Sequence, residues 1–177
     1  PAINDIITGW QKHLEIDRYF HSSDFFLTRS HELKLLLKPA IASSPVKPFF
    51  LGHIALELIL DNLLITTNKI SVTDFYKHLD ACNTDIIKEF LNFAGLADTT
   101  RFFKFYEGFK KSRYLETYAE EHQIAYALKR ICMRVWDNPF TPDQEQIMTD
   151  ILSAYRKDMY ADFMTIFDQI ATRLSGS

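Results

Sequence analysis

Residues that form tight turns are scarce in this sequence. Of its 177 residues, only 5 are glycine and 6 are proline. A protein built from many β-hairpins needs such residues at its turns, so their scarcity argues against an all-β fold. Long helices joined by a few turns are favoured instead.

Cysteine is also rare. Cys82 and Cys132 are the only 2 cysteines in the chain, and their wide separation matches no paired metal-binding spacing. We interpret both as reduced thiols, which is typical of a cytoplasmic protein.

The chain lacks a basic excess and a long uncharged apolar run. Its 20 lysines and arginines are outnumbered by 23 acidic residues, which gives a net charge of −3. A general nucleic-acid binder carries a positive balance. No uncharged apolar run approaches the ~20 residues that span a bilayer, and the N-terminus does not resemble a signal peptide. We therefore expect a soluble cytoplasmic protein that binds neither nucleic acid nor a membrane.

Apolar and aromatic residues are abundant. Hydrophobic residues make up 47% of the chain, including 15 Phe and 8 Tyr, which is enough for the core of one domain over residues 1–177. Apolar positions recur every three or four residues, as on helices. The clearest segments are 3–21, 24–37, 48–66, 114–136 and 142–174. The sequence thus predicts an all-α bundle of about seven or eight helices.

Helix starts are marked by capping residues. Ser71 and Asn83 each precede an apolar helical pattern, and Thr141 is followed by a proline and then by Gln144. A Thr and a Gln at this spacing form a capping box, and proline suits the first helical position. We therefore expect helices to begin after each of these residues.

One spacing of ionisable residues occurs twice. Residues at i, i+4 and i+8 lie along one face of a helix. Imidazole and carboxylate are ligands that suit manganese, iron or zinc, and helical bundles build metal sites from such faces. The two sets are His13, Asp17 and His21 on the first helix, and His53, Glu57 and Asp61 on the third.

The surroundings of the two sets differ. On the first helix, a solvated face with weak i, i+4 pairs explains the pattern equally well. The third helix is almost entirely apolar around its ionisable groups, and an unpaired charge in such a place is costly. A metal, a hydrogen-bond network or a polar groove would each supply partners for these groups.

Two stretches resemble the acyl carrier protein phosphodiesterases, all-helical relatives of the HD-type metal phosphohydrolases. Residues 9–20, GWQKHLEIDRYF, resemble that family's Gly-Ile-x-x-His-Arg-x-Ile-Asp-x-Phe signature. Residues 57–64, ELILDNLL, resemble its Asp-x-x-x-Asp-His-Phe-Leu segment, with Asn62 in the place of the histidine. The resemblance covers about the first third of the chain.

The resemblance implies an HD-like fold and metal-dependent hydrolysis of the phosphodiester that joins phosphopantetheine to acyl carrier protein. Manganese is the expected metal, with iron or zinc as alternatives, and the substrate is the carrier protein or a small phosphodiester. A divalent cation in such a site lowers the pKa of its bound water. The implied ligands are His13, Asp17, His53 and Asp61, with Glu57 or His21 as a further ligand or as the proton-transfer group.

Two further features bear on substrate binding. Basic residues including Lys110 and Arg113 alternate with aromatic residues over positions 101–114; they form either a docking surface for a phosphate or an acidic protein, or the solvated face of a core helix. His122 and Arg130 lie on one late helix and are candidate substrate-binding residues together with Arg113.

Two other functions fit the same patterns. The polar helix faces would suit a binding module without catalytic activity, in which they form a buried network or a ligand groove. They would also suit another metal-binding bundle, with an oxidative or ligand-storage role.

Overall fold

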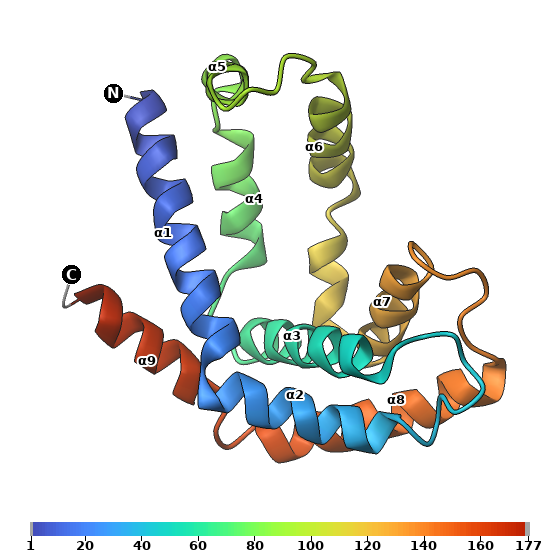
Figure 1. The fold of residues 1–177 in the computed structure, drawn as a ribbon. Helices are drawn as coiled ribbons and strands as arrows, with labels where there is room; N and C mark the ends of the chain where they lie inside the picture. Colours follow the sequence, from blue (N-terminus) through green and yellow to red (C-terminus); the bar gives the residue numbers. More distant parts are fainter. Residues whose placement is uncertain (1, 176–177) are drawn as a thin grey trace. The chain divides into compact units, whose positions relative to one another are not determined.

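The computed structural model describes residues 2–175, and over that range it contains helices and no strands. This confirms the prediction of an all-α fold (Figure 1). The elements are α1 (Ala2–Ser22), α2 (Asp24–Leu37), α3 (Pro48–Thr66), α4 (Val72–Asp80), α5 (Thr84–Phe93), α6 (Thr100–Ser112), the 3₁₀ helix η1 (Tyr114–Ala119), α7 (His122–Cys132), α8 (Pro142–Met159) and α9 (Met164–Ser175).

The chain divides into two compact units. The first comprises the chain up to Arg18 together with Ser71–Glu116, and the second comprises Tyr19–Ile70 and Thr117–Ser177. Helix α1 contributes its last residues, from Tyr19 onward, to the second unit. A single domain over residues 1–177 and an HD-like architecture both stay predictions.

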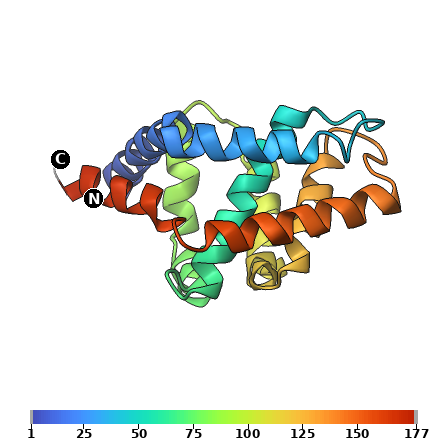
Figure 2. The same cartoon turned by 90° about the horizontal axis from the view of Figure 1, so that it is seen from below.

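Helix α3 is the centre of the second unit. It packs against α2, α7 and α8. Figure 1 shows α3 on one side of α2 and α8, and Figure 2 shows it crossing both of them. Side chains around more than half of the circumference of α3 are buried, including those of Leu51, Leu56, Ile59 and Leu63. The prediction that this helix is buried on most sides is confirmed. Its length and composition would suit a membrane span, but half of that stretch is buried inside the structure, as in the core helix of a globular protein.

Gly52 allows α3 to approach α2 closely. A Cβ atom at this position would lie 2.6 Å from the carbonyl oxygen of Ser30 and 2.8 Å from the backbone nitrogen of Lys34. Only glycine leaves room for such backbone contact between two helices. The spacing of α2 and α3 is therefore set at this residue.

The first unit is built around a pair of buried tyrosines on α4 and α6. Tyr76 is fully buried and Tyr106 is 8% exposed. The Tyr106 hydroxyl donates to the carbonyl of Leu79 at 2.8 Å, which joins α6 to the end of α4. The predicted caps are confirmed: Ser71 accepts from the backbone of Asp74, and Asn83 accepts from that of Asp85.

Two predicted helices are broken in the structure. In the stretch 114–136, the carbonyl of Tyr118 accepts a hydrogen bond from the side-chain amide of Asn62 at 2.5 Å, close to the point where the helix is interrupted. The chain forms η1 and then α7 instead. The last helix is interrupted between Met159 and Met164, where Asp162 pairs with Arg29 of α2.

Candidate metal centre

The junction of α1 and α2 positions the first residue of the site. Ser23 alone separates the two helices; its hydroxyl donates to the carbonyl of Phe20 at 2.7 Å and accepts from the backbone of Phe26 at 3.1 Å. This cap begins α2 immediately after α1. As a result, His21 in the last turn of α1 lies close to Phe26 in the first turn of α2.

Three ionisable side chains converge here. His21 comes from α1, and His53 and Glu57 come from successive turns of α3. The Nε2 atom of His53 lies 3.3 Å from Oε1 of Glu57, and Nε2 of His21 lies 3.5 Å from the same oxygen. The possible ligand atoms of all three residues lie within 4.8 Å of one another.

Aromatic rings form one wall of this cluster. The rings of His21 and His53 are stacked, with centroids 4.7 Å apart and planes 15° from parallel. Phe26, which is 2% exposed, meets both imidazoles edge-on at 4.6 and 4.8 Å. Phe20 contacts His21 at 5.1 Å. The apolar wall holds both imidazoles in nearly parallel planes beside the carboxylate of Glu57.

Two of the three ligand-atom separations in the cluster fit a small divalent cation. Ligand atoms about 2.0–2.1 Å from a tetrahedral zinc ion are separated from one another by about 3.3–3.4 Å. The two distances from Glu57 to the imidazoles, 3.3 and 3.5 Å, fall close to this spacing. The side chains are 29–41% exposed, so the cluster is open to solvent on one side. Two imidazoles and one carboxylate are a common donor set of catalytic zinc and non-haem iron sites.

Comparison with known proteins assigns no relative. No protein-family model, curated protein or solved structure matches the chain. The interpretation of the cluster therefore depends on its own geometry.

Asp61 lies one turn beyond Glu57 on α3, outside the cluster. Burial, together with the nearby carboxylate of Glu57, raises the pKa of Asp61 to about 6 from an ordinary value of 3.8. A half-buried aspartate of this kind can exchange a proton near neutral pH. Its expected role as a metal ligand stays a prediction.

The predicted ligands of the first helix lie elsewhere. His13 and Asp17 are exposed and belong to the first unit, whereas His21, His53 and Glu57 belong to the second. The ring of His13 packs against Trp10 at 5.4 Å. Of the two predicted sets, the structure brings together one residue of α1 and two of α3.

The predicted substrate-binding residues are dispersed along the chain. Arg113 lies in the first unit, where its guanidinium stacks on Tyr76 at 4.4 Å and pairs with Glu116 at 2.7 Å. His122 and Arg130 are exposed on α7 in the second unit, and His122 lies 3.4 Å from Glu120. A role in substrate binding stays a prediction for all three.

Asn62 has a structural role that sequence patterns did not reveal. Its side chain is fully buried; its amide donates to Tyr118 of η1, and its oxygen accepts from Arg156 of α8. Arg156 also donates to Thr66 at 3.0 Å. Asn62 therefore joins α3 to η1 and α8. Its place as a polar residue in a mostly apolar helix was the only signal for it.

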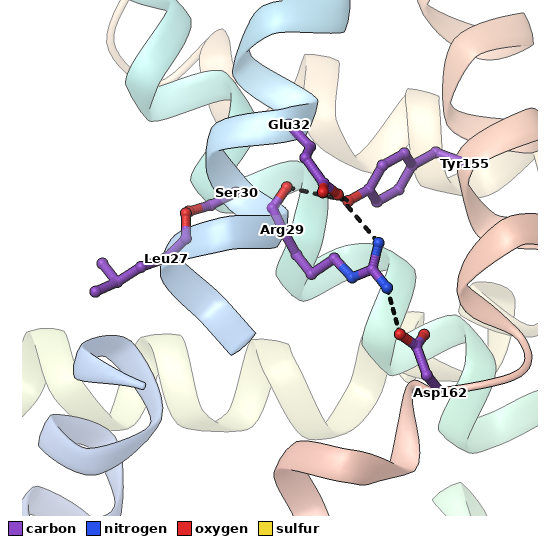
Figure 3. Close-up of polar contacts among 6 residues, drawn as sticks. All are labelled: Leu27, Arg29, Ser30, Glu32, Tyr155 and Asp162. Carbon is purple, nitrogen blue, oxygen red and sulfur yellow. Dashed lines mark hydrogen bonds and ion pairs between the residues drawn. The ribbon is translucent and has the colours of Figure 1, made fainter. Parts of the chain in front are cut away.

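A second polar network joins α2 to α8 and to the turn before α9 (Figure 3). Arg29 pairs with Asp162 and, at 3.1 Å, with Glu32. The hydroxyl of Tyr155 donates to Glu32 at 2.5 Å, and this hydrogen bond is the main reason why the pKa of Glu32 is lowered. Burial and the same hydrogen bond raise the pKa of Tyr155. The network fixes the position of α2, whose first turn carries Phe26.

Proposed function

We propose that this chain is a metal-dependent hydrolase of phosphodiesters, with His21, His53 and Glu57 as the protein ligands of one divalent cation. The convergence of these three side chains from two helices is the observation that carries the proposal. The resemblance of residues 9–20 and 57–64 to the acyl carrier protein phosphodiesterases supports the reaction and names the carrier protein as one substrate.

The donor set bears on which metal is bound. Manganese, the metal first expected from the sequence, prefers sites richer in oxygen ligands, whereas imidazole suits zinc and iron. With two imidazoles and one carboxylate, the cluster favours zinc or iron over manganese. A bound cation of this kind polarises a phosphoryl oxygen and lowers the pKa of a coordinated water.

The side chains around the cluster have three roles: metal binding, exclusion of water and proton transfer. Two imidazoles and Glu57 hold the cation, and the rings of Phe20 and Phe26 exclude water from one side of the imidazoles. Asp61, with a pKa of about 6, holds or releases a proton near the site. His21 and Glu57 thus act as ligands in this proposal, and Asp61 takes the proton-transfer role.

Metal content tests the site first. Protein purified without chelator is analysed for zinc, iron and manganese, with His53→Ala and Glu57→Gln as test variants and His122→Ala as the control. His122 is exposed and lies outside the cluster. We expect about one zinc or iron per chain in the parent protein and the control, and at least a tenfold loss of affinity in both test variants. Equal metal content in all four proteins would refute the site.

A second pair of variants distinguishes the ligand set found in the structure from the one implied by the family resemblance. The geometry predicts that His21→Ala loses the metal and that His13→Ala keeps it. The resemblance alone, which assigns His13 as a ligand, predicts the opposite order. Measuring metal affinity in both variants therefore decides which residue of α1 belongs to the site.

Activity tests the reaction separately. The metal-loaded protein is assayed with bis(p-nitrophenyl) phosphate and with holo-acyl carrier protein, and we expect hydrolysis that depends on both Glu57 and the metal. A protein that binds metal without hydrolysing either substrate retains the site but not the reaction. A redox-active iron spectrum in that protein would point to oxidative chemistry.

A structural role without metal is the alternative. Both imidazoles already lie within ion-pair distance of Glu57, so the three groups are satisfied as partners of one another when a histidine is protonated. In that case His53→Ala would lower stability by about 1–3 kcal/mol and added metal would not change the melting temperature. A metal-dependent rise in melting temperature that His53→Ala abolishes would exclude this alternative.

A further inference from the structure

The basic residues of α6 fall into two groups. Two of them have partners within the first unit: Lys110 pairs with Glu107 at 3.1 Å and lies 4.8 Å from the ring of Tyr106, and Arg113, just after the helix, pairs with Glu116 and stacks on Tyr76. These two cations contribute to the packing of the unit.

The other three cations are displayed to solvent. Arg101, Lys104 and Lys111 are exposed, and none of them forms an ion pair with any part of the chain from 2 to 175. At 100° per residue they lie within an arc of about 120° on the helix. Phe105 lies on the same arc and is 66% exposed. We call these four residues the α6 basic face.

Gly108 leaves a gap in the middle of this face. A Cβ atom at Gly108 would meet nothing within 4 Å. The side chains of Phe105 and Lys111 therefore border an open stretch of backbone, which gives a partner side chain room to approach. An exposed phenylalanine beside such a gap is a typical anchor position in protein interfaces.

The length of the face excludes a single small anion. Arg101 and Lys111 are separated by ten residues, or about 15 Å along the helix axis. One phosphate or carboxylate accepts hydrogen bonds from groups that surround it within a few ångströms. An occupant that meets all three cations must carry several negative charges spread over a similar length.

A membrane surface or a nucleic-acid backbone fits the α6 basic face poorly. Exposed acidic side chains, Asp98 before the helix and Glu107 within it, lie beside the basic positions and would face a membrane or a nucleic-acid backbone. Phe105 is the only large apolar side chain on the face, whereas helices that lie in a bilayer surface bury a wide apolar side. A narrow acidic helix can contact the cations without meeting these carboxylates.

We propose that the α6 basic face binds an acidic helical segment of a partner protein, with Phe105 as the apolar anchor between its cations. Carboxylates at i, i+3 and i+10 on the partner match the spacing of Arg101, Lys104 and Lys111. The inference depends only on the first unit and is independent of the metal centre.

Binding of a defined peptide tests this proposal. The probe is a fluorescein-labelled, alanine-based helical peptide with glutamates at i, i+3 and i+10 and one leucine between them; its control has glutamine at the same three positions. Anisotropy titrations at low salt compare the parent protein with R101Q/K104Q/K111Q and with K12Q/K69Q/K88Q. The second triple variant removes the same charge from exposed lysines outside the face.

We expect the glutamate peptide to bind, the first triple variant to weaken binding about tenfold or more, and the second to leave it unchanged within about twofold. Phe105→Ala should weaken binding several-fold, while Phe93→Ala, which removes a 74% exposed ring on α5, should not. Binding should also weaken as salt is raised, because the cations are exposed.

Three results would overturn the proposal. The first is equal binding of the glutamate and glutamine peptides, and the second is equal weakening by both triple variants. The third is tighter binding, through the same three cations, of vesicles containing phosphatidylserine or of single-stranded DNA. Circular dichroism of each variant confirms that α6 and the rest of the chain remain folded.

Discussion

Replacing Gly52 by alanine tests the packing that brings the metal centre together. Gly52 lies one residue before His53, at the point where α3 meets the backbone of α2 between Ser30 and Lys34. An added Cβ would lie 2.6 Å from the Ser30 carbonyl oxygen and 2.8 Å from the Lys34 nitrogen. Both contacts are with backbone atoms, which cannot rotate away as a flexible side chain can.

The size of the effect follows from these distances. Ordinary contact begins near 3.4 Å, so the two helices must separate locally by roughly 0.6–0.8 Å. Overpacking of this kind costs about 1–3 kcal/mol, while alanine regains about 1 kcal/mol of helix propensity. The separation also loosens the packing of Leu33 and Leu56, which are fully buried. We expect a net loss of up to about 2 kcal/mol, or a fall in melting temperature of up to about 8 °C.

Gly9→Ala is the matched control. It makes the same chemical change in a helix, but a Cβ at Gly9 would meet nothing within 4 Å. It should therefore raise stability by up to about 1 kcal/mol through propensity alone. Thermal unfolding followed by circular dichroism gives both values, and metal titration of Gly52→Ala reports whether His53 has moved relative to His21. A Gly52→Ala variant as stable as Gly9→Ala would show that backbone contact does not set the spacing of α2 and α3.

Three further outcomes follow from the ionisable groups. The pKa of Asp61 is raised from 3.8 to about 6, so the folding free energy that its ionisation costs grows as pH rises from 3.8 to about 6 and is fully present at pH 7. Metal-free Asp61→Asn should therefore be more stable than the parent protein by about 1–3 kcal/mol at pH 7. It should also lose less stability as pH rises through that range. Tyr155→Phe removes the hydrogen bond that contributes most to lowering the pKa of Glu32, while Arg29 still favours the ionised form. The variant should lose about 1 kcal/mol of stability at neutral pH. Denaturant unfolding below about pH 4.5 should show a smaller additional loss than in the parent protein, because the ionised form of Glu32 is favoured less in the folded state. Burial raises the pKa of the Cys132 thiol to about 11, whereas Cys82 is exposed; iodoacetamide followed by mass spectrometry should label Cys82 in the folded protein and Cys132 only after unfolding.

Local signals in the sequence predicted most helix starts. The cap of Ser71 and the capping box of Thr141 with Gln144 are present as expected, because each depends on residues within one turn of the helix. The breaks within the two long predicted helices were not predictable in this way. They depend on contacts with distant residues, namely Asn62 with Tyr118 and Arg29 with Asp162. Apolar periodicity alone continues through both breaks.

In the candidate site, too, local sequence predicts some features and contacts between distant residues determine the others. The pair of His53 and Glu57 follows from i, i+4 spacing on a single helix, and the structure confirms it at 3.3 Å. The third member could not be chosen from the sequence, because His13, Asp17 and His21 share one helical face with equal spacing. Ser23 and Gly52 decide between them: the first begins α2 one residue after α1, and the second lets α3 approach α2.

The stacked imidazoles show why these two small residues matter for chemistry. The rings of His21 and His53 are stacked 4.7 Å apart, and both lie beside the carboxylate of Glu57. A neutral imidazole has a lone pair available for a metal, and Glu57 supplies the negative charge that a divalent cation requires. The contact between α2 and α3 at Gly52 and the cap at Ser23 keep the two rings close enough to share one carboxylate.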